Sequence, residues 1–70
     1  MADMEFKQVM EPAAFAQVLR AAADAVERGE TMQLTLQGQS ITLQPKGQLE
    51  VEYEREKGKN ELQFEIKWYE

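Results

Sequence analysis

The C-terminal stretch of the chain reads Glu61-Leu62-Gln63-Phe64-Glu65-Ile66-Lys67-Trp68-Tyr69-Glu70. Large apolar residues occupy every second position, and charged or amide residues lie between them. A period of two places alternate side chains on opposite faces of a β-strand. The stretch therefore predicts an extended final strand with one apolar face, and the rest of the chain must supply what covers that face.

The stretch before it, residues 49–56, has the same period. Leu49, Val51 and Tyr53 alternate there with four glutamates, and a turn near Gly58-Lys59 leads into the final strand. A three-residue loop is rejected because it would send the apolar side chains of one strand into water. A loop of two or four residues sets three apolar pairs opposite each other: Tyr53 and Phe64, Val51 and Ile66, Leu49 and Trp68.

A second hairpin is predicted in the middle of the chain. Met32, Leu34 and Leu36 alternate with polar residues, and so do Ile41 and Leu43 after them. Gly38-Gln39 lies between the two runs and fits a two-residue type II′ turn, which has glycine at its first central position. In that register Leu36 is opposite Ile41 and Leu34 is opposite Leu43.

A helix is predicted from about residue 12 to 28. Pro12 suits the first helical turn, where its missing N–H has no partner to lose. Gly29 suits the left-handed residue that ends a helix. The apolar residues recur at intervals of three and four, which is typical of one buried face: Phe15, Val18, Leu19, Ala22 and Val26.

These elements predict one α+β domain over residues 1–70, in the order β-α-β-β-β-β. The first strand is the imperfectly alternating run Glu5–Met10, placed at a sheet edge with its neighbour left open. The predicted architecture has two layers: a mostly antiparallel sheet of four to five strands, and one α-helix packed on its apolar face.

The two C-terminal strands resemble the Amphi-Trp domain, a family of small domains named for an amphipathic C-terminal segment that ends in tryptophan. The alanine-rich helix that ends at Gly29 and the hairpin around Gly38 are similar too, so the resemblance runs from about residue 5 to 69. It implies the fold described above. It implies no biochemical activity, cofactor or catalytic residue.

The composition excludes several classes of function. The 70 residues carry a net charge of −5 and contain neither cysteine nor histidine. Thiolate metal sites, disulfides and histidine-based catalysis are therefore absent, and we expect a protein that is not an enzyme and has no cofactor. The negative charge argues against direct nucleic-acid binding. No run of residues is apolar and long enough to span a membrane, so we expect a cytoplasmic protein.

The most unusual feature is an acidic set on the polar side of the C-terminal hairpin. In the predicted register Glu52 faces Glu65 and Glu56 faces Glu61, and like charges opposite each other destabilise a sheet. The set is either a solvated surface or a site for a basic protein partner, with nucleic-acid mimicry and divalent-cation binding as weaker alternatives. The candidate partner-binding residues are Glu50, Glu52, Glu54, Glu56, Glu61, Glu65 and Tyr69.

Trp68 lies on the apolar side of the final strand and is predicted to be a core residue or an interface anchor. No metal site and no catalytic set is predicted. The leading hypothesis is a small non-enzymatic interaction domain that acts through its open polar and acidic sheet face or as a homodimer. The alternative is a module that binds a small ligand or a divalent cation.

Overall fold

The computed structural model describes residues 3–69. It contains one helix followed by four antiparallel strands: α1 (Pro12–Arg28), β1 (Met32–Leu36), β2 (Gln39–Leu43), β3 (Gln48–Glu56) and β4 (Lys59–Lys67). The α+β class and this order of the helix and the four strands were predicted, and both are confirmed.

Helix α1 begins and ends where its sequence predicts. Proline lies in the first turn, and Gly29 adopts the left-handed conformation with φ 67° and donates its N–H to the carbonyl of Ala25. Gln44, just after β2, donates its side-chain amide to the carbonyl of Gly29 at 3.0 Å. This contact fastens the end of the first hairpin to the end of the helix.

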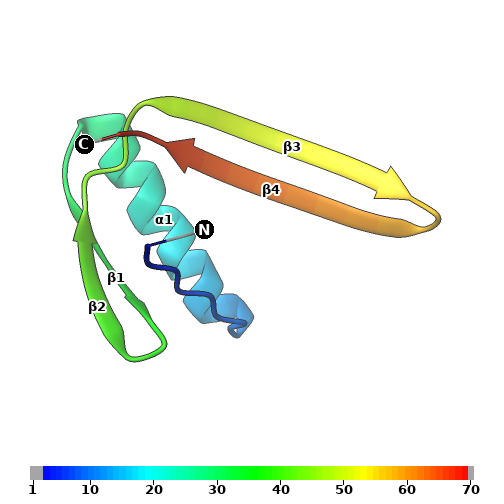
Figure 1. Ribbon diagram of the computed structural model, residues 1–70, viewed down its shortest axis with the longest axis horizontal. Coiled ribbons are helices and arrows are strands. Elements are labelled where there is room, and N and C mark those ends of the chain that lie inside the picture. The colour runs from blue at the N-terminus through cyan, green and yellow to red at the C-terminus, as the bar shows by residue number, and fades with distance from the viewer. Residues whose placement is uncertain (1–2, 70) are drawn as a thin grey trace.

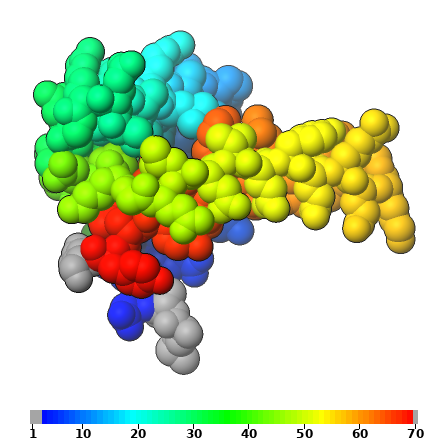
Figure 2. Space-filling view, turned by 90° about the horizontal axis from the view of Figure 1, so that it is seen from above, coloured from blue at the N-terminus to red at the C-terminus, as the bar shows by residue number. Residues whose placement is uncertain are grey.

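The strands form two separate sheets, β1–β2 and β3–β4. The single sheet of four to five strands predicted from the sequence is therefore wrong for residues 3–69. Hairpin β1–β2 lies along α1, whereas hairpin β3–β4 leaves the C-terminal end of the helix and extends away from it (Figure 1). Viewed from above, the tip of β3–β4 forms an arm that projects beyond the rest of the molecule (Figure 2).

The predicted strand Glu5–Met10 is extended chain without strand pairing. Its hydrogen bonds to the first hairpin involve side chains instead of a backbone ladder. The backbone N–H of Gln37 donates to Oε1 of Gln8 at 2.8 Å, and the Gln37 side-chain amide donates to the carbonyl of Lys7 at 2.6 Å. Val9 is 95% exposed. The imperfect alternation of this segment is consistent with that result, because neither of its faces is consistently apolar.

Both hairpin registers differ from prediction by two residues. The first turn is Gln37-Gly38 and the second is Lys57-Gly58, and all four residues have positive φ, as a type I′ turn requires. The observed apolar pairs are Met32 with Leu43, Leu34 with Ile41, Leu49 with Ile66, Val51 with Phe64 and Tyr53 with Leu62. Because the shift is even, each residue keeps its predicted face.

The core is small and lies beside α1. Ala25 and Met32 are buried, with 2% and 9% of their surface exposed, and Pro45 between the two hairpins is buried as well. No large side chain within residues 3–69 is fully buried. Ten large apolar side chains in this part of the chain are exposed to water.

Gly47 fixes the joint between the two hairpins. It has φ 90°, and a Cβ built on it would lie 2.4 Å from the carbonyl oxygen of Lys67 and 3.1 Å from Cβ of Trp68. Any side chain here would meet backbone at the end of β4, so the joint depends on a glycine.

We predict that Gly47→Ala lowers the free energy of unfolding by about 1–3 kcal/mol, because it combines an unfavourable φ with a backbone clash. Urea unfolding followed by circular dichroism measures the change. Gly58→Ala is the matched control, since Gly58 has φ 81° but nothing within 4 Å of the added Cβ. An equal loss in the two variants would contradict the role given to the Lys67 carbonyl.

Candidate functional site: the apolar face of the β3–β4 hairpin

The β3–β4 hairpin has two faces of opposite character. In the observed register, Leu49, Val51 and Tyr53 share one face with their partners on β4. The six glutamates predicted as partner-binding residues share the other face, since they occupy the alternate positions. The predicted separation of the apolar and the acidic side chains is therefore present in the structure.

The apolar face is exposed. Five of its six large side chains have more than half of their surface exposed, and the sixth, Ile66, is half-buried. On α1, Phe15 is 52% and Leu19 is 39% exposed. The five hairpin residues are Leu49 at 57%, Val51 at 66%, Tyr53 at 62%, Leu62 at 62% and Phe64 at 58%.

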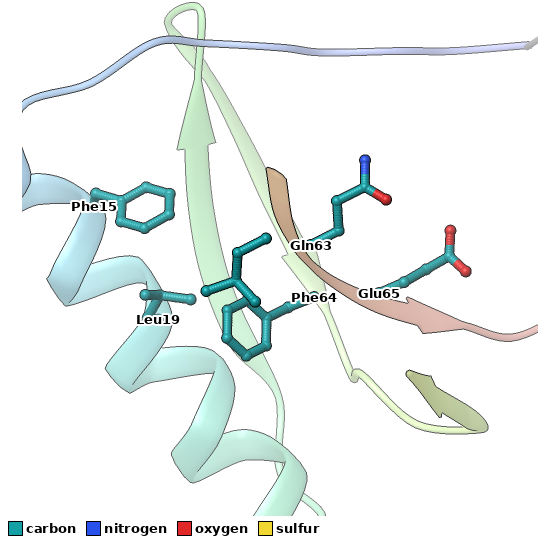
Figure 3. Close-up of a pocket in the computed structure, with 6 residues that line it drawn as sticks. Phe15, Leu19, Gln63, Phe64 and Glu65 are labelled. Atoms are coloured by element: carbon teal, nitrogen blue, oxygen red, sulfur yellow. The ribbon is translucent and has the colours of Figure 1, made fainter. Parts of the chain in front are cut away.

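An open groove separates this face from the helix. Near the N-terminal half of α1 the groove is lined by Phe15, Leu19, Leu62 and Phe64. The Phe64 ring points toward Leu19, whereas Gln63 and Glu65 point away from the helix (Figure 3). Toward the C-terminal end of α1 a second lobe of about 500 Å³ continues between the two elements. The groove is open to water although its walls are mostly apolar on both sides, so it provides contact area for another apolar surface.

Arg55 and Asn60 end the apolar face at the hairpin tip, where they lie opposite each other. The Tyr53 hydroxyl donates to Oδ1 of Asn60 at 2.5 Å. That bond satisfies the polar end of Tyr53 and leaves its ring free for apolar contact. On this face the tip therefore carries apolar area next to the positive charge of Arg55.

The acidic face is solvated and internally repulsive. Glu50 lies opposite Glu65 and Glu54 lies opposite Glu61. The predicted pairs of Glu52 with Glu65 and of Glu56 with Glu61 are wrong, because Glu52 faces Gln63 and Glu56 faces Lys59. Two lysines relieve part of the repulsion along β4: Lys59 lies 3.3 Å from Glu61 and Lys67 lies 3.6 Å from Glu65.

The acidic face has a shallow hollow of about 50 Å³ around Glu50, Glu52, Gln63 and Glu65. Within residues 3–69 no group of three or more acidic side chains could hold a metal ion. The same part of the chain contains no helix that is both long and apolar enough to cross a bilayer.

Trp68 follows β4 and is half-buried at the joint with Gly47, outside the strand ladder. Its predicted pairing with Leu49 is wrong, since Leu49 pairs with Ile66. Tyr69, a predicted partner-binding residue, is 91% exposed. The two aromatic residues line a wide hollow with Lys46 and Lys67, away from the groove.

Sequence reasoning missed the groove and the exposed helix residues Phe15 and Leu19. It assigned the apolar face of the hairpin to a covered core. The sequence did contain a signal for the exposed face: it has two hairpins, each with an apolar face, and only one predicted helix to cover them.

Three comparisons with known proteins complete the description. The family model of the Amphi-Trp domain matches residues 1–70, the whole chain. No curated protein and no solved structure matches the chain.

We predict that Trp68→Ala lowers the free energy of unfolding by about 2–4 kcal/mol, because the partly buried indole loses its contacts at the joint. Urea unfolding followed by circular dichroism measures the loss. A change below about 0.5 kcal/mol would remove Trp68 from the joint and leave it a surface residue.

We predict that Glu54→Lys raises the free energy of unfolding by about 0.5 kcal/mol, because it turns the repulsive pair with Glu61 into an attractive one. Glu52→Lys is the control, and its gain should be smaller because Glu52 faces an uncharged glutamine. Thermal unfolding at low salt ranks the two variants. A larger gain for Glu52→Lys would support the register predicted from the sequence.

Proposed function

The chain belongs to the Amphi-Trp domain family, and we propose that it is a non-enzymatic interaction domain that acts as a homodimer. The reason is that its geometry leaves one face of a hairpin without cover. The contact surface is the apolar face of β3–β4. One observation carries the proposal: five large apolar side chains are more than half exposed on a hairpin that pairs with no further strand among residues 3–69.

The physical support is that a lone two-stranded hairpin is at best marginally stable in water. It gains independent stability when its apolar face packs against a further layer. With hydrophobic burial worth about 25 cal/mol per Å², covering this face is a large favourable term. A second copy supplies an apolar face of the same size, and the pair forms the layered packing that a single chain lacks.

Charge decides which faces meet. The acidic face carries six glutamates and two lysines, so two such faces brought together would repel each other. The apolar faces carry no such penalty. Association through them leaves both acidic faces in water.

The acidic face supports a second proposal, that the dimer presents it to a basic protein partner. The observation behind this proposal is the pair of like-charge contacts, Glu50 with Glu65 and Glu54 with Glu61. A cationic partner would relieve a repulsion that the isolated hairpin retains. The alternative module, one that binds a small ligand, would use the groove beside α1 in place of this face.

We predict that Phe64→Glu converts the dimer into a monomer and raises the dimer dissociation constant at least about 100-fold, because it places a charge in an apolar contact. Size-exclusion chromatography with light scattering measures the mass across a dilution series.

Gln63→Glu is the matched control: it adds the same charge at the neighbouring position on the opposite face. Val51→Glu is a second test, and circular dichroism verifies that each variant is folded. A folded wild-type protein that is monomeric at high micromolar concentration contradicts the homodimer.

A further inference from the structure

We infer that the two copies clasp each other about a two-fold axis, with the hairpin tip of each copy packed against the N-terminal half of α1 in the other. This inference rests on the proposed homodimer. It adds a surface on the helix that the homodimer alone does not require, and it specifies which residues of the second copy the tip meets.

Two apolar patches without cover carry the inference. One is on α1, where Phe15 and Leu19 are exposed, and the other is at the hairpin tip, where Tyr53 and Leu62 are exposed. At the base of the hairpin Ile66 is half-buried, but Leu49 opposite it is 57% exposed. The uncovered area therefore runs along the hairpin and includes its tip, the part that a reciprocal clasp requires.

The arms match in length. The nine-residue strands β3 and β4 extend about 30 Å, and the seventeen-residue helix extends about 25 Å. Hairpin and helix diverge as two arms that meet at the C-terminal end of α1 (Figure 1). A two-fold axis that bisects the angle between the two arms exchanges them, so the hairpin of each copy lies along the helix of the second copy and its tip reaches the N-terminal half of that helix.

The area also favours participation of the helix. Stable interfaces bury about 800 Å² per partner. The five hairpin side chains, at roughly 100 Å² of exposed surface each, offer about 500 Å² and fall short of that area. Phe15 and Leu19 add roughly 200 Å², which brings the contact close to the area of a stable dimer.

The charges at the ends of the two patches are complementary. On the helix, Leu19, Phe15 and Glu11 follow one another at intervals of four residues, about 6 Å apart. On the hairpin, Val51, Tyr53 and Arg55 follow at intervals of two residues, about 6.7 Å apart. Each series runs through two apolar residues to one charge, and the two charges have opposite sign.

Glu11 is available for such a contact. It is exposed at the N-cap of α1, and its side chain makes no capping hydrogen bond. A pair with Arg55 of the second copy would place each charge at the rim of the apolar contact, where it sets the register of the clasp.

The chain has no cysteine, so single-cysteine variants test the clasp directly. Tyr53→Cys and Phe15→Cys proteins are mixed in equal amounts and oxidised, and a disulfide between the two variants can form only between copies. We expect a cross-linked yield at least about tenfold above that of the control mixture, Gln63→Cys with Phe15→Cys. Mass spectrometry of the linked peptides identifies the pair.

The outcomes separate the clasp from the homodimer. A light-scattering dimer that yields a Phe64→Cys self-disulfide, with no excess of the Tyr53–Phe15 link over the control, overturns the clasp and leaves the homodimer standing. A monomer overturns both.

Charge reversal gives a second readout. Arg55→Glu alone should raise the dimer dissociation constant about threefold to tenfold, and Glu11→Arg in the same chain should restore it. Failure of the second change to restore dimerisation of a folded protein contradicts the pairing of Glu11 with Arg55.

Discussion

The structure depends on one constraint: an amphipathic hairpin of two strands cannot cover its own apolar face. Side chains alternate along β3 and β4, so every residue that points to one side is apolar or near the tip, and every residue that points to the other is polar. Helix α1 is already occupied along one side by the β1–β2 hairpin. The apolar side chains of the longer hairpin, β3–β4, therefore remain exposed, and the proposed association follows from this lack of a covering layer.

The sequence predicted the elements well because their periods are strong. The 3.6-residue repeat from Phe15 to Val26 and the two-residue repeats of both hairpins each allow one secondary structure. Register was harder to predict. A shift of two residues leaves every side chain on its face, so the apolar pattern cannot distinguish the two registers. The observed registers require positive φ at Gln37 and Lys57, a conformation that is more usual for glycine.

Long-range arrangement was the least predictable part. Nothing in the alternation of Leu49, Val51 and Tyr53 states whether their face meets a helix of the same chain, a helix of another chain or water. The acidic residues of the candidate site were placed correctly on one face, because parity alone decides it. The groove beside Phe15 and Leu19 was not predicted, because it exists only through the angle between two elements.

The angle between the hairpin and the helix depends on the joint at Gly47. The hairpin extends about 30 Å from the joint, where the Lys67 carbonyl occupies the space that a side chain at Gly47 would need. A rotation of about 10° at this joint displaces the far end by about 5 Å, roughly the spacing of adjacent strands. A substitution at this one contact would therefore change the direction of the whole hairpin relative to the helix, while every residue of the apolar face stays the same.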